Sequence, residues 1–109
     1  MTTEATRATG AELIAAERTR QVEQEGRTPA HDAQHGGGEL ASAAVAYISW
    51  ALCLEAPGNP LAAPDDEPPA SWPWWHSEFK PSPDPVRSLV KAGALIAAEI
   101  DRIQAASDD

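Results

Sequence analysis

The chain of 109 residues carries 17 Asp and Glu residues against 8 Lys and Arg residues, which gives a formal net charge of -9 at pH 7. This length suits one domain over residues 1–109, with frayed tails expected at 1–9 and 106–109. Acidity without a block of Lys or Arg argues against duplex nucleic acid and anionic membranes as partners. Because the chain shows no apolar run of ~20 residues and no signal-peptide pattern at its N-terminus, we expect a cytoplasmic protein.

The first predicted element is a helix over residues 10–26. This segment contains good helix formers, no proline, and a final glycine that suits a left-handed C-terminal cap. The side chains expected on its apolar face are Leu13, Ile14, Ala16 and Val22. Glu17, Gln21 and Glu25 follow at intervals of four residues, so they form a polar stripe that we expect to be solvated.

A loop and a second helix come next. Residues 27–38 contain a proline, three consecutive glycines and two histidines, which excludes a long regular element. Residues 39–54 predict a mostly buried helix. The side chains expected on its buried face are Leu40, Ala43, Ala44, Tyr47, Ala51 and Leu54. The single cysteine, Cys53, lies in this apolar segment and is expected to be a small core residue.

Residues 55–84 form a long connection. They contain eight of the ten prolines, which excludes regular helix over most of this length. The second half holds three tryptophans and one phenylalanine within eight residues. Because so much aromatic surface is unfavourable in water, we expect this part to fold back over the helices as an ordered cap or to line a pocket.

A third helix is predicted from Asp84 and Pro85 to about residue 105, since a carboxylate cap followed by proline favours a helix start. The side chains that repeat with the helical period, and that we expect to be buried, are Leu89, Ala92 or Gly93, Ile96, Ile100 and Ile103. No alternating run of strand length appears. The predicted fold class is all-α, with three main helices and a long, ordered Pro/Trp-rich loop between the second and third.

The first candidate cluster consists of His31, Asp32, His35 and Glu39. Imidazole and carboxylate groups suit a transition metal, but such a site needs three or four converging ligands with further support. Hydrogen bonding within the loop and contact with a polar ligand are the other two interpretations. We predict ligand contact for these four residues, and neither a metal nor a cofactor.

Three glutamates, Glu17, Glu25 and Glu39, suggest an alternative function. All-α nucleotide pyrophosphohydrolases of the MazG type hold Mg²⁺ with carboxylates from several helices, in an ExxE pattern followed by ExxD. That pattern is incomplete in this chain. A metal-dependent nucleotide hydrolase that uses these glutamates with His31 or His35 is therefore the alternative, and no catalytic residue is assigned.

Aromatic and basic side chains form the third cluster, near the start of the last helix. Trp74 or Trp75 would stack on a nucleobase, because indole faces bind bases of any sequence. Lys80, Arg87 and Lys91 would bind phosphates through charge-assisted hydrogen bonds. In so acidic a chain, this grouping of cations favours a ligand that combines a base with phosphates.

Two further interpretations concern the same region. Arg18 and Arg20 are additional cations that would assist ligand binding. The tryptophans of segment 72–79 have a simpler interpretation as the missing part of the core. If that segment is exposed instead, it suits a hot spot for a protein partner, which is the third function that we consider.

Three blocks of sequence together resemble a known family. They read ERTRQVEQEGRTPAHDAQHGGGELASAAVAY, WPWWHSEFKP and LVKAGALIAAEIDRI, in this order, within residues 17–103. They resemble small accessory proteins encoded by phages and prophages, some of which are called Ea22-like. The family commonly has WTxxHD after the EG pair, where this chain has Arg27.

That resemblance implies a phage accessory role, with possible action against host defence. Small acidic phage proteins include binders of nucleotide second messengers and direct inhibitors of defence enzymes. Together with the third cluster, it predicts a non-enzymatic protein that sequesters a small nucleotide-derived signal, such as an ADP-ribose derivative or a cyclic nucleotide.

The chain is also expected to form a homo-oligomer. Ala and Gly are abundant along the second and third predicted helices, so an isolated subunit would bury little apolar area. Closed two-fold symmetry is the commonest arrangement. It would place ligand pockets at or near the subunit junctions.

Overall fold

The computed structural model describes residues 7–26, 38–62 and 68–107. It contains the α-helices α1 (Gly10–Glu25), α3 (Glu39–Glu55) and α4 (Pro85–Ser107), and a 3-10 turn η2 (His76–Glu78). These residues contain no strand, so the predicted all-α class is confirmed. Within the same residues, no helix combines the length and the apolar character needed to cross a bilayer.

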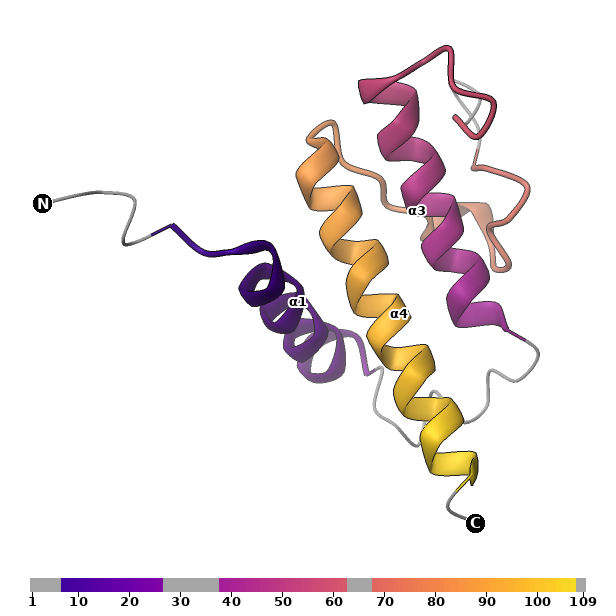
Figure 1. The fold of residues 1–109 in the computed structure, drawn as a ribbon. Helices are drawn as coiled ribbons and strands as arrows, with labels where there is room; N and C mark the ends of the chain where they lie inside the picture. Colours follow the sequence, from indigo (N-terminus) through magenta and orange to yellow (C-terminus); the bar gives the residue numbers. More distant parts are fainter. Residues whose placement is uncertain (1–6, 27–37, 63–67, 108–109) are drawn as a thin grey trace, which may run out of the picture.

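α4 lies between the other two helices (Figure 1), and both α1 and α3 pack against it. The segment that precedes α4 passes behind α3, emerges between α3 and α4, and enters α4 at Pro85. The molecule is flat, with principal extents of 44 × 42 × 22 Å. Two sides of α4 therefore contact the neighbouring helices, and its other two sides are directed toward the two broad surfaces of the molecule.

The helix ends follow the sequence signals. Thr9 caps α1, since its hydroxyl accepts from the Glu12 backbone N–H at 3.2 Å, while the Glu12 carboxylate accepts from the Thr9 N–H at 2.8 Å. Gly26 adopts the predicted left-handed conformation with φ of 71°. The Asp84 carboxylate accepts from the Val86 N–H at 3.0 Å at the start of α4. α4 continues to Ser107, into the tail that we expected to fray.

The core lies between α3 and α4. Its buried members are Leu40, Ala43, Ala44, Ala46, Tyr47, Trp72, Phe79, Ala92, Leu95 and Ala98. The face predicted for α3 is thus confirmed, except at Leu54, which is exposed because it lies in the last turn of the helix. Cys53 is only half-buried, so it is not the core residue that we expected.

The aromatic segment, residues 72–79, folds back over α3 as predicted, and we call it the aromatic cap. Trp72 and Phe79 are buried against Tyr47 of α3, with ring centroids 5.6 Å and 4.9 Å from the tyrosine ring. The Trp72 indole N–H donates to the Trp75 carbonyl at 2.8 Å, and the Ser42 hydroxyl donates to the Ser71 carbonyl at 2.5 Å. Buried aromatic surface and satisfied polar groups together fix this cap on α3.

The prediction for the buried face of α1 is wrong. Glu17 and Gln21, which we expected in solvent, are buried, whereas Leu13 and Ala16 of the expected apolar face are exposed. The reason lies on α4, where a cation pairs with Glu17 and makes burial of the polar stripe favourable.

The prediction for the buried face of α4 is correct at Ala92 and wrong at its large side chains. Leu89, Ile96, Ile100 and Ile103 are 47%, 43%, 50% and 50% exposed. The buried side chains are instead Ser88, Val90, Ala92, Ala94, Leu95, Ala98 and Glu99. Small Ala side chains let helices approach closely, so the two neighbouring helices pack on the Ala-rich sides of α4.

Candidate functional site

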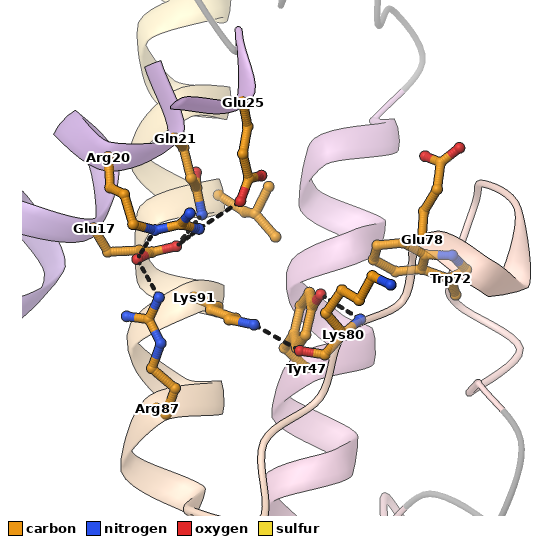
Figure 2. A pocket seen from close by; sticks show the side chains of 11 residues that line it. Glu17, Arg20, Gln21, Glu25, Tyr47, Trp72, Glu78, Lys80, Arg87 and Lys91 are labelled. Atoms are coloured by element: carbon orange, nitrogen blue, oxygen red, sulfur yellow. Dashed lines mark hydrogen bonds and ion pairs between the residues drawn. The ribbon is translucent and has the colours of Figure 1, made fainter. Parts of the chain in front are cut away.

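A buried carboxylate, that of Glu17, organises the candidate site (Figure 2). The Arg20 guanidinium donates to both of its oxygens, at 2.9 Å and 2.8 Å. Arg87, from α4, contacts the Glu17 Oε1 atom at 2.6 Å, and the Gln21 amide donates to Oε2 at 3.0 Å. Each carboxylate oxygen therefore has two donors, and the cluster links α1 to α4.

The charge state of Glu17 follows from these contacts. Burial raises the pKa of this carboxyl, but hydrogen bonds from Arg20, Arg87 and Gln21 outweigh it and lower the pKa to about 2. The same pairing raises the pKa of Arg20 above its usual value. Glu17 is thus a carboxylate at all physiological pH values, held between two guanidinium groups.

Two lysines lie next to this cluster. The Lys91 ammonium donates to the Lys80 carbonyl at 2.6 Å and lies 5.6 Å from the centroid of the Tyr47 ring. The Lys80 backbone N–H donates to the Tyr47 hydroxyl at 3.1 Å. Tyr47 therefore fixes the backbone of Lys80, and this backbone in turn positions Lys91.

Burial lowers the pKa of Lys91, and the positive charge of Arg87 lowers it further, although Glu17 and Glu25 act in the opposite direction. Among the described residues, neither Lys91 nor Lys80 makes an ion pair with a carboxylate. The pocket lining that includes Lys91 carries four basic and three acidic side chains, a formal excess of one positive charge, although the chain as a whole is acidic.

These groups line a pocket of about 210 Å³ between α1, α4 and the start of the aromatic cap. The residues that line it are Glu17, Arg20, Gln21, Glu25, Tyr47, Trp72, Glu78, Lys80, Arg87, Lys91 and Leu95. Four of the eight Lys and Arg residues of the chain are in this set. Gln21 Oε1 is buried and accepts no hydrogen bond from any residue that the structure describes.

The structure brings together only part of the predicted site. Lys80, Arg87 and Lys91 line one pocket, as their proposed common role requires. Trp74 and Trp75 do not line it; with Pro73 and Glu78 they form a separate shallow hollow, and Glu78 lines both. Trp75 is 78% exposed, whereas Trp74 is half-buried.

The other predicted ligand contacts are dispersed. Glu39 lies at the start of α3, where its carboxylate accepts from the Trp74 indole N–H at 3.3 Å. Arg18 approaches Asp101 of α4 at 3.9 Å and is absent from the pocket. His31, Asp32 and His35 lie outside the described residues. Within the described residues, no group of three His, Cys, Asp or Glu side chains is placed to hold a metal ion.

Sequence reasoning missed Tyr47 as a site residue. It placed Gln21 in the acidic stripe and Trp72 in the aromatic segment without assigning either to ligand binding, and it gave Glu17 only to the hydrolase alternative. The signal for α1 was present, since Glu17, Gln21 and Glu25 recur every four residues and their stripe faces the pocket. What the pattern does not contain is the partner, because Arg87 is 70 positions away in sequence.

Comparison of the chain with family models, with curated proteins and with solved structures gives no match.

Proposed function

We propose that this chain is a phage-type accessory protein that binds and sequesters a small nucleotide-derived signal, such as an ADP-ribose derivative or a cyclic nucleotide, and so counteracts host defence signalling. The observation that supports this proposal is the convergence of Arg20, Lys80, Arg87 and Lys91 on one pocket. In a chain of net charge -9, half of all Lys and Arg residues lie there. The extension from anion binding to a role against defence rests on the resemblance to phage proteins.

The charge balance of the pocket favours an anionic ligand. Arg20 is committed to Glu17 and Glu25, with the latter contact at 2.5 Å, and Arg87 shares Glu17. Lys91 and Lys80 add two ammonium groups beside this balanced cluster and Glu78 adds one carboxylate, so the lining has a formal excess of one positive charge. Burial and the positive charge of Arg87 make the charged form of Lys91 less favourable. A phosphate beside Lys91 would stabilise this charged form, and that stabilisation is a source of affinity.

The size of the pocket limits what it holds. A whole drug-sized ligand occupies about 300 to 1,000 Å³, whereas this pocket measures about 210 Å³. The proposal therefore places the phosphate end of the ligand inside, against Lys80 and Lys91, with the rest of the molecule toward solvent. Tyr47 and Trp72 wall the pocket, and Trp74 and Trp75 are not part of it.

The test is a ligand-release experiment. The pure protein is incubated with a panel of cyclic nucleotides and ADP-ribose derivatives, freed of unbound ligand and heat-denatured, and the supernatant is analysed by chromatography. Intact ligand in the supernatant supports sequestration. Absence of retained ligand across the panel defeats the proposal.

Two variants make this test specific. Lys91→Met keeps the aliphatic stem but removes a charge-assisted contact, so Kd should rise by about tenfold or more. Arg7→Gln is the matched control, because it removes one exposed positive charge outside the pocket. Equal weakening by both variants would indicate non-specific attraction to the whole chain.

The same panel decides the hydrolase alternative. With Mg²⁺ or Mn²⁺ present, an enzyme would return cleaved product at substoichiometric protein, whereas a binder returns its ligand unchanged. A metal ion at Glu17 would have to displace the donors of Arg20 and Arg87, which occupy both carboxylate oxygens.

A second candidate function, direct inhibition of a host enzyme, is favoured by one observation. Trp75 is 78% exposed next to Trp74 and Pro73, and exposed tryptophan is typical of protein-binding hot spots. A tagged wild-type chain should then capture one host enzyme from lysate and inhibit it when purified, and Trp75→Ala should abolish both effects. Retention of inhibition by Trp75→Ala would exclude this surface.

A further inference from the structure

The exposed aliphatic side chains of α4 form a continuous stripe. Leu89, Gly93, Ile96, Ile100 and Ile103 follow at alternating intervals of four and three residues, which is the spacing of the seam between two long, paired helices. The four large side chains are each 43% to 50% exposed. Gly93 is the point in this series where Ile14 of α1 packs, since a Cβ atom there would lie 2.6 Å from Ile14 Cδ1.

This stripe lies on the side of α4 opposite the pocket. Arg87 precedes Ile96 by nine residues, and Lys91 precedes Ile100 by nine, which is about two and a half helical turns in each case. Arg87 and Lys91 line the pocket. One face of the flat layer therefore carries the polar pocket, and the other face carries the apolar stripe.

We propose that a second copy of this chain covers the stripe, so that two molecules pack through α4 against α4 about a two-fold axis. Charge does not oppose a second copy on this face. The stripe has no charged member, and the flanking charges are used within the chain, because Asp101 pairs with Arg18 and Arg102 with Glu99. Contact along the stripe therefore adds no like-charge pair to the general repulsion between two chains of net charge -9.

The size of the core supports the same partner. Among the described residues, five of the ten members of the buried core are alanines, so a single layer has a small apolar interior. The four side chains are only half exposed, so a contact made through them alone is small beside the ~1,000 Å² of a stable interface, and we expect a weak, concentration-dependent dimer. Back-to-back layers leave both pockets open to solvent, rather than at the subunit junction expected from the sequence.

The test is the mass in solution over a concentration series from micromolar to hundreds of micromolar, by sedimentation equilibrium. Wild-type chain should approach twice 11.5 kDa. The double variant Ile96→Asp, Ile100→Asp should stay at 11.5 kDa with unchanged helical circular dichroism. Val45→Asp is the matched control, since Val45 is 49% exposed on α3, away from the stripe, and it should dimerise like the wild type.

A cross-linking variant keeps the test decisive if the double variant loses its fold. Ile96 is the midpoint of the stripe between Leu89 and Ile103. The Ile96 side chains of the two copies therefore lie next to each other whether the paired helices run parallel or antiparallel. Ile96→Cys in a Cys53→Ser background should form a disulfide-linked dimer on mild oxidation. A wild-type monomer at every concentration, a dimer that persists in the double variant, or no cross-link from residue 96 would each overturn the proposal.

Discussion

Substitution of Glu17 by Gln tests the central electrostatic feature of the fold. The pKa of this carboxyl falls from 4.5 to about 2, so the charged form is favoured in the folded chain by about 3 kcal/mol, at about 1.4 kcal/mol per pKa unit. Glutamine also leaves Arg87 without its counter-charge, whereas Arg20 keeps only its pair with Glu25. We expect Glu17→Gln to lower the free energy of unfolding by about 3 kcal/mol at pH 7, within the range for a buried pair that loses one partner.

The assay is urea denaturation followed by circular dichroism, with the midpoint as readout and an unchanged m-value as the check for a two-state comparison. Glu23→Gln, an exposed position on the same helix, is the control and should change stability by less than about 0.5 kcal/mol.

The pH dependence supplies an independent check on the same substitution. Because the folded pKa is depressed, the contribution of Glu17 is complete above pH 4.5 and is lost as the pH falls toward about 2. The stability difference between wild type and Glu17→Gln should therefore shrink across that window. Equal stability of the two proteins at pH 7, or a difference that stays constant down to pH 2, would refute the reasoning.

Three further substitutions follow from the packing. Gly93→Ala should lower the free energy of unfolding by about 1 to 2 kcal/mol, because the new Cβ would lie 2.6 Å and 2.8 Å from Ile14 Cδ1 and Cγ1. In an Ile14→Ala background the same substitution should raise stability, because alanine favours a helix over glycine. Thermal melting with Gly or Ala at position 93, in each background, measures the two effects. Thr9→Ala should cost about 1 kcal/mol through loss of the capping box, whereas an unchanged melting temperature would show that the cap contributes nothing. Trp72→Ala should cost about 3 to 5 kcal/mol in urea denaturation and Trp75→Ala less than about 0.5 kcal/mol, so equal losses would contradict the packing of the cap.

The helix boundaries were predictable because their signals are local. Gly26 and the Asp84–Pro85 pair determine their helix ends through backbone geometry and one side-chain hydrogen bond, both encoded within a few residues. Burial of the aromatic segment was also predictable, because its apolar area is too large to remain in water. The sequence did not say that Trp72 packs inside and Trp75 points outward, since that depends on where Tyr47 lies.

The buried faces were less predictable, for a physical reason. A helical period shows which side chains share a face but not what covers that face. On α4 the large Ile side chains share one face, yet the Ala-rich sides offer closer approach to α1 and α3. For the site, Lys80, Arg87 and Lys91 were found by charge and spacing, whereas their link to Glu17 depends on a contact between the two ends of the chain.

The way α1 is attached has a consequence for motion. α1 packs on α4, and the side chains that it buries there include Glu17 and Gln21, which contribute charge pairing rather than apolar area. A helix held mainly by one polar cluster can detach without melting the α3 and α4 core, so its amides should exchange with deuterium faster than those of Leu40 to Ala51. Because Arg20 reaches the pocket from α1, a bound phosphate would slow that exchange and join α1 to the cooperative unit of the rest of the chain.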